Sequence, residues 1–122
     1  MKLDVDPTRM GFGRGLEKAG DDERVVTLHA DISGSIGIAD FESKHPERQH
    51  RVFSVGIAQQ YMMEVAAGLA KEGLFPVTGT YGVFASGRCW DQIRTLCYSI
   101  WSASTTVSAS PASHGNWSRS LV

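Results

Sequence analysis

The sequence lacks the features that would place the protein in a membrane or on nucleic acid. No apolar run within its 122 residues approaches the roughly 18 to 20 residues that a transmembrane helix needs. The 12 basic and 13 acidic side chains give a formal net charge of -1, so no positive excess points to nucleic acid or an anionic membrane as a partner. The charged start, MKLDVDPTRM, has no apolar stretch and does not resemble a signal peptide. We therefore expect a cytoplasmic protein.

Cysteine is also scarce, because Cys89 and Cys97 are the two in the chain. Both fall in one expected helix, where a separation of eight residues at about 1.5 Å each gives about 12 Å, too far for a disulfide. Neither has the spacing of a metal ligand relative to the four histidines. We expect buried free thiols and no metal site on this chain.

What the chain does contain is an alternation of strand and helix patterns. Compact β-branched or apolar runs predict strands, and apolar residues at helical spacing predict helices. Such alternation indicates an α/β fold with a parallel sheet, right-handed crossovers and helices on both faces. The length fits one domain with one core. The expected strands are 24–30, 51–54 and 74–78, and the expected helices are 8–19, 38–44, 58–72 and 84–98.

The composition changes from about residue 99 onward. The segment from that point, which ends in SASPASHGNWSRSLV, is rich in Ser, Thr and Ala and has no clear period. This composition is typical of a loose or disordered tail, although a domain of this type would normally add another strand here. We therefore expect an incomplete domain over 1–98, truncated on its C-terminal side, and a divergent or disordered tail over 99–122.

Three expected loops lie where a parallel sheet binds ligands, at the carboxyl ends of strands. They are rich in glycine and polar residues and span 31–37, 54–60 and 79–87. In the first, hydroxyl and backbone N–H groups suit a phosphate or an ordinary helix cap equally well. In the third, Tyr81 and Phe84 suit either a flat ring ligand or the core, and the residues alone favour the core.

The glycines of Gly11-Phe-Gly-Arg-Gly15 offer a weaker signal. Their spacing matches neither of the common phosphate-binding loops, and no convincing strand precedes them. We interpret them as residues that allow close packing of the first helix.

Four motifs stand in one order along the chain: Thr8-Arg9…Phe12-Gly13, Ala30-Asp-Ile-Ser-Gly-Ser35, Val55-Gly-Ile-Ala-Gln-Gln60 and Gly79-Thr-Tyr-Gly-Val-Phe84…Gly87-Arg88. In this order and at these spacings they resemble the transketolase family. In particular, they are similar to the pyrimidine-binding domain of thiamine-diphosphate enzymes, in the form of the small, C-terminal subunit of split transketolases. The resemblance covers about residues 7 to 98.

The resemblance implies roles for particular residues. Tyr81 and Phe84 match the aromatic pair that forms the pocket for the aminopyrimidine ring of thiamine diphosphate, and Asp31 matches an acidic residue beside the cofactor. Arg9 and Ser35 match positions that bind the phosphate end of a sugar phosphate. A guanidinium suits that role because it offers two parallel donors to a phosphate.

Gln59 stands at the position of the family's catalytic glutamate, because the family motif reads Gly-Ile-Ala-Glu-Gln. In the family this carboxyl hydrogen-bonds the ring nitrogen N1′ of the aminopyrimidine and supplies a proton. An amide can donate a hydrogen bond but cannot transfer a proton at an accessible pH. The neighbouring Gln60 and Glu64 point in other directions around the helix and do not replace it.

The resemblance therefore implies a transketolase-like subunit that supplies the aminopyrimidine half of a thiamine-diphosphate site, for transfer of a two-carbon ketol unit between sugar phosphates in carbohydrate metabolism. The diphosphate and Mg²⁺ would be held by a separate N-terminal transketolase subunit in a hetero-oligomer, because the Gly-Asp-Gly…Asn motif is absent here. Two alternatives stay open. One is a non-catalytic cofactor-binding or regulatory paralogue, suggested by Gln59, and the other is a truncated or frame-shifted fragment, suggested by the change near Ser99.

Overall fold

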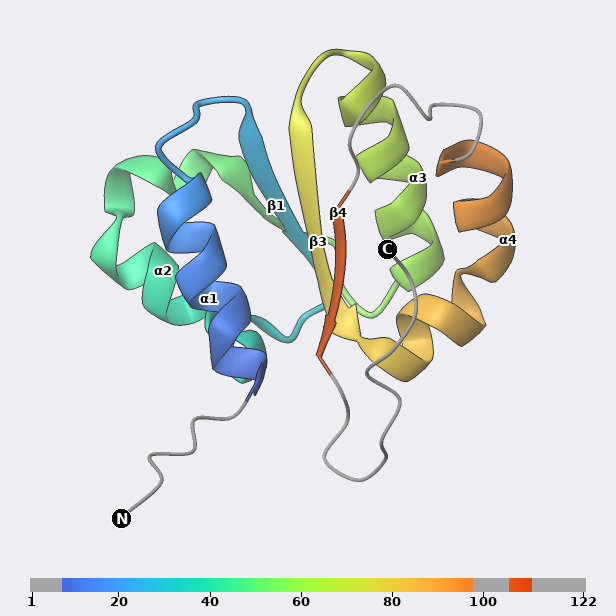
Figure 1. The fold of residues 1–122 in the computed structure, drawn as a ribbon, viewed down its shortest axis with the longest axis horizontal. Helices are drawn as coiled ribbons and strands as arrows, with labels where there is room; N and C mark the ends of the chain where they lie inside the picture. Colours follow the sequence, from blue (N-terminus) through green and yellow to red (C-terminus); the bar gives the residue numbers. More distant parts are fainter. Residues whose placement is uncertain (1–7, 98–105, 111–122) are drawn as a thin grey trace.

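A parallel sheet forms the centre of the protein. The computed structural model describes residues 8–97 and 106–110. Within these residues, four strands pair in the order β2-β1-β3-β4, all of them parallel. Helices cover both faces of the sheet, with α1 and α2 on one side and α3 and α4 on the other (Figure 1), which confirms the predicted fold class. The strands are β1 (Val25–His29), β2 (Val52–Ser54), β3 (Phe75–Tyr81) and β4 (Thr106–Ser110).

The first three long helices follow the prediction closely. Helices α1 (Thr8–Ala19) and α2 (Ile38–Lys44) have the predicted bounds, and α3 (Gln59–Lys71) lies within one residue of them at each end. Gly73 follows α3 with φ +87°, the left-handed conformation that commonly ends a helix at glycine. Short 3-10 helices, η1 (Ser33–Ile36) and η2 (Pro46–Arg51), flank α2.

The last predicted helix is not continuous. Its described part consists of η3 (Phe84–Arg88), α4 (Trp90–Gln92) and η4 (Ile93–Cys97). The first and last of these have the wider turn of a π-helix. Because π-turns are frequent at functional sites, these two stretches are candidates for part of such a site.

Strand β4 corrects the expectation for the C-terminal segment. We expected no strand after residue 98, yet Thr106–Ser110 pairs in parallel with β3. The strand is hard to recognise because its two alternating apolar residues, Val107 and Ala109, are small and lie in a segment rich in Ser, Thr and Ala. The same pairing carries β3 three residues beyond its predicted end, through Gly79 to Tyr81. Residues 99–105 and 111–122 lie outside the described part of the chain, so the expected tail and truncation stay predictions there.

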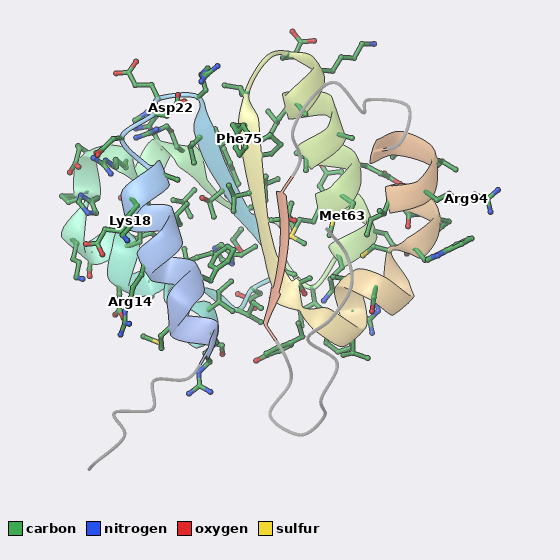
Figure 2. The ribbon with its side chains drawn as sticks, viewed as in Figure 1. Arg14, Lys18, Asp22, Met63, Phe75 and Arg94 are labelled. Carbon is green, nitrogen blue, oxygen red and sulfur yellow. The ribbon has the colours of Figure 1, made fainter. Side chains whose placement is uncertain are left out.

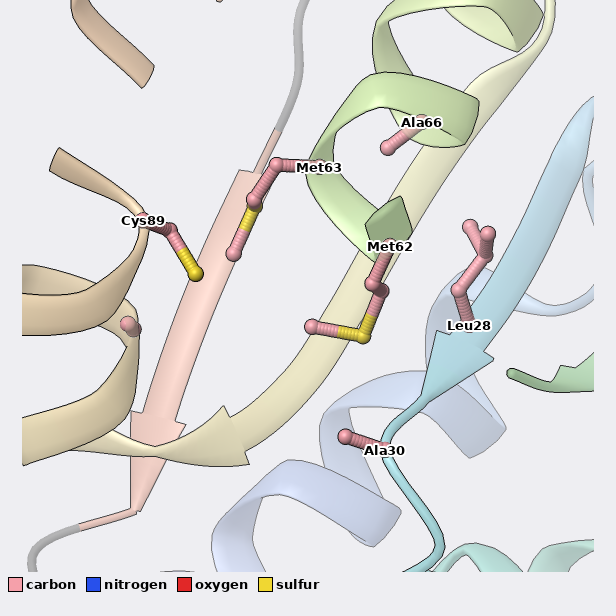
Figure 3. Packing of buried hydrophobic residues seen from close by; sticks show 7 residues of the cluster. Leu28, Ala30, Met62, Met63, Ala66 and Cys89 are labelled. Carbon is pink, nitrogen blue, oxygen red and sulfur yellow. The ribbon is translucent and has the colours of Figure 1, made fainter. Parts of the chain in front are cut away.

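The core consists of one apolar cluster on each face of the sheet. All five positions of β1 are buried, as expected for a strand covered on both sides. On one face Leu28 and Ala30 pack against Met62 and Met63 of α3, and Cys89 completes the cluster (Figure 3). On the other face the cluster is formed by residues of α1, β1, η1 and α2: Leu16, Val25, Ile36, Ile38 and Phe41.

Cys89 is a fully buried free thiol, as predicted, and its burial raises the pKa of the thiol.

Charged side chains lie on the outside of the helices, where Lys18 and Arg94 point away from the sheet (Figure 2). Within residues 8–97 and 106–110, no helix combines the length and apolar character that crossing a membrane requires.

Helix α1 approaches the junction of η1 and α2 through two glycines. A Cβ placed on Gly13 would lie 2.7 Å from the carbonyl oxygen of Gly37, which itself has φ +77°. Nothing lies within 4 Å of a Cβ placed on Gly11 or Gly15. The interpretation of these glycines as close-packing residues therefore holds for Gly13 and is wrong for the other two.

Candidate functional site

The start of α3 lies at the end of the sheet where the parallel strands finish (Figure 1). Residues 55–58 connect β2 to α3, and the N–H of Val55 donates to the carbonyl oxygen of His29 at 3.0 Å. Gly56 turns the connection with φ +69°. These contacts place the first turn of α3 beside the carboxyl end of β1.

Gln59 is the first residue of α3 and is 3% exposed. Its Oε1 accepts a hydrogen bond of 2.9 Å from Nη1 of Arg88, which ends η3. The same guanidinium stacks on Phe84, with its Cζ 4.4 Å from the ring centroid. Contacts among described residues thus join α3 to η3 through Arg88.

Tyr81 and Phe84 form an aromatic pair at the end of β3. Their ring centroids are 6.1 Å apart and the ring planes meet at 65°, an edge-to-face arrangement. Both residues are partly buried, and within the described residues neither belongs to the two core clusters. Simple core packing, which the residue types alone favoured, therefore does not describe these rings.

Asp31, Ser35 and Arg9 come from elements at the same end of the fold. Asp31 is exposed two residues after the end of β1 and has φ +57°, a left-handed conformation that costs a non-glycine residue free energy and often occurs at ligand sites. Ser35 is partly buried in η1, and its N–H donates to the carbonyl oxygen of Ile32 at 2.9 Å. Arg9 is exposed in the first turn of α1, which packs against η1. No hydrogen bond joins Arg9, Ser35 and Gln59 to one another in the described part of the chain.

Buried polar side chains lie in the strands that lead to this end. Within the described residues, Oγ1 of Thr78, Oγ1 of Thr80 and Nδ1 of His29 are buried and have no hydrogen-bond partner. Burial lowers the pKa of His29, while the nearby Glu42 and Asp31 act in the opposite direction. Burial of His29 therefore favours its neutral imidazole form.

Arg88 stands in one of the four sequence motifs, but the motif alone indicates no role for it. The spacing of Phe84 and Arg88, four residues apart in an expected helix, was a usable signal because such residues share a helix face. A guanidinium and an aromatic ring on one face commonly pair. The contact with Gln59, 29 residues earlier, could not be found this way because it depends on how α3 and η3 pack.

The chain is similar to known proteins in both sequence and structure. The sequence model of the transketolase pyrimidine-binding domain matches residues 7–118. The chain belongs to this family. The match extends beyond the 7–98 covered by the motifs and includes β4.

Similar family members are considerably longer than this chain. The protein named as the transketolase C-terminal section of Methanocaldococcus jannaschii is 43% identical over 89 residues, covering 72% of this chain and 27% of that protein. The 1-deoxy-D-xylulose-5-phosphate synthase of Clavibacter sepedonicus is 34% identical over 115 residues, covering 88% of this chain and 17% of the synthase. A solved structure described as "Split gene transketolase, inactive beta4 tetramer" has a TM-score of 0.63 and 39% identity, covering 82% of this chain and 32% of that chain.

Proposed function

We propose that this pyrimidine-binding domain supplies the aminopyrimidine half of a thiamine-diphosphate site that transfers a two-carbon ketol unit between sugar phosphates. The observation that carries the proposal is that Arg88 links Gln59 to Phe84, which pairs with Tyr81, at the carboxyl end of the parallel strands. Membership of the transketolase pyrimidine-binding family supports it. A cytoplasmic location is part of the proposal.

The residues present fit an aminopyrimidine. Tyr81 and Phe84 offer partly buried aromatic surface for a flat ring, and the buried amide of Gln59 offers a directional hydrogen bond. Asp31, at the end of β1, would lie beside the cofactor. Thiamine diphosphate, when bound, supplies the carbanion chemistry that breaks and forms the carbon–carbon bond. The residues of this chain bind and orient its pyrimidine.

The sugar phosphate would be held by Arg9 and Ser35. These residues come from α1 and η1, which pack against each other. The exposed guanidinium of Arg9 can donate two parallel hydrogen bonds to a phosphate, and Ser35 can add its hydroxyl.

The other half of the site would come from an N-terminal transketolase subunit that holds the diphosphate and Mg²⁺. Large apolar side chains that are 42% to 74% exposed occur in segments 53–61 and 83–90, which contain Gln59 and Phe84. Exposed apolar surface beside a site is typical of a surface that another protein covers. The beta4 tetramer is described as inactive, which agrees with the need for a second kind of chain. The exposed residues are Phe53, Ile57, Tyr61, Val83 and Trp90.

Gln59 favours a second candidate function, that of a cofactor-binding or regulatory paralogue. The candidate site has aromatic and hydrogen-bonding groups, but the amide cannot act as the general acid. Loss of a positioned general acid typically lowers a rate by roughly 10²- to 10⁴-fold. A paralogue of this kind would bind thiamine diphosphate with its partner and show no turnover.

The proposal is tested by mixing the chain with the diphosphate-binding subunit of a split transketolase, thiamine diphosphate and Mg²⁺. Calorimetry is expected to show cofactor binding that needs both chains, and a ketol-transfer assay is expected to show turnover. Phe84→Leu, which keeps apolar bulk but removes the aromatic face, should weaken binding roughly 2- to 10-fold. Binding without turnover would favour the paralogue. Absence of cofactor binding to the mixture would contradict both candidates.

A further inference from the structure

Arg88 lies between two residues of the proposed pyrimidine pocket. Its Nη1 is 2.9 Å from Oε1 of Gln59, and its Cζ is 4.4 Å from the centroid of the Phe84 ring. Because Phe84 begins η3 and Arg88 ends it, a single helical turn holds both members of the stacked pair. The stacking restricts the guanidinium plane, so its hydrogen bond to the buried Gln59 has a defined direction.

The chemistry of the two groups fixes which way the amide of Gln59 faces. A guanidinium has five N–H donors and no acceptor, and a glutamine amide has one acceptor oxygen and one donor NH₂ group. Turning the amide over would set its NH₂ group against the N–H groups of Arg88. Oε1 must therefore face Arg88, and Nε2 lies on the opposite side of the amide.

We propose that Arg88 is a positioning residue: it holds the side-chain oxygen of Gln59 in a hydrogen bond, so that Gln59 binds a ligand through its N–H donors. This inference rests on the proposed function for the identity of the ligand. The ring nitrogen that faces Gln59 must then be a hydrogen-bond acceptor, which is the unprotonated form of the aminopyrimidine. An ionised carboxylate in the same place has no donor of its own, so it would instead accept a hydrogen bond from a protonated ring nitrogen.

The orientation of Gln59 can be measured without any ligand. In the NMR spectrum of the full chain, the side-chain carbonyl carbon and amide signals of Gln59 are assigned by their disappearance in Gln59→Glu. Arg88→Met should shift these signals, and Arg88→Lys, which keeps a cationic donor, should restore part of the shift. Arg94→Met is the matched control, because Arg94 also stacks on an aromatic ring, 5.1 Å from the centroid of Trp90, and points away from the sheet (Figure 2). Unchanged Gln59 signals in a folded Arg88→Met variant would overturn the proposal.

A second measurement uses the unmutated chain, so it does not depend on a variant that folds. The complex with the diphosphate-binding subunit is titrated with thiamine diphosphate and with an analogue in which C–H replaces N1′. The wild-type complex should bind the analogue roughly tenfold or more weakly, because the buried N–H of Gln59 loses its acceptor. Equal affinity for the two ligands would overturn the proposal. If neither ligand binds, the proposed function fails, and the NMR comparison alone decides the role of Arg88.

Discussion

The contact of Gly13 with Gly37 predicts a large difference between two alanine substitutions in the same helix. Gly13→Ala places a methyl group 2.7 Å from the carbonyl oxygen of Gly37, closer than real Cβ atoms approach, so α1 or the η1–α2 junction must shift. Overpacking of this kind costs about 1–3 kcal/mol. Gly15→Ala has nothing within 4 Å of its new methyl group and serves as the matched control.

Both substitutions replace glycine by alanine within α1, so both gain about 1 kcal/mol of helix propensity. This gain cancels when they are compared, and the difference between them isolates the steric cost. We expect Gly15→Ala to be up to about 1 kcal/mol more stable than wild type and Gly13→Ala to be about 1–3 kcal/mol less stable than Gly15→Ala. Urea unfolding followed by circular dichroism measures both. Equal unfolding midpoints for the two variants would refute the close approach of α1 to Gly37.

Two further predictions concern pH. Burial lowers the pKa of His29 below 6.5, so over a range of pH the unfolded chain binds a proton that the folded chain does not. The free energy of unfolding should therefore fall as pH drops below about 6.5. His29→Leu should reduce this fall, as measured by urea titrations at pH 7.5 and pH 5. An equally steep fall in the variant would count against the assignment. Hydrogen bonds from Arg24 lower the pKa of Asp22 to about 2, so the stabilisation is present above about 3.8 and is lost as pH falls through about 2. Arg24→Gln should raise the pKa of Asp22 toward 3.8 in a carboxyl NMR titration, and an unchanged value would contradict the pairing.

The sequence predicts the elements of residues 8–73 well because local signals mark where they end. The turn from Gly20 ends α1, Pro46 follows α2, and Gly73 ends α3 in a left-handed conformation. The parallel pairing follows from the alternation of strands and helices, whereas the order β2-β1-β3-β4 is known from the structure alone.

Later elements depend on contacts that the local sequence does not encode. Gly79 weakens a strand pattern, yet β3 continues through it because β4 pairs there and Ile36 and Phe12 pack against its open face. Strand β4 has two small apolar residues, Val107 and Ala109, that alternate with Ser and Thr, and this short pattern is too weak to identify the strand without its pairing to β3. The π-turn of η3 likewise leaves no clear mark in its five residues.

The candidate site, like the fold, is predictable from the sequence only in part. The order of the motifs identifies Gln59, Tyr81 and Phe84, and the structure brings them to one end of the sheet. The role of Arg88 emerges from packing between α3 and η3. Exposed apolar surface around the site is visible in the fold but not in a count of hydrophobic residues.

The most direct test of the central claim is the rate of ketol transfer when Gln59→Glu is mixed with the diphosphate-binding subunit, thiamine diphosphate and Mg²⁺. Gln60→Glu is the matched control, because it makes the same substitution at the exposed neighbouring position. We expect Gln59→Glu to raise the rate over wild type by roughly 10²- to 10⁴-fold and Gln60→Glu to leave it unchanged. A rate for Gln59→Glu no higher than that of wild type or Gln60→Glu would contradict the account.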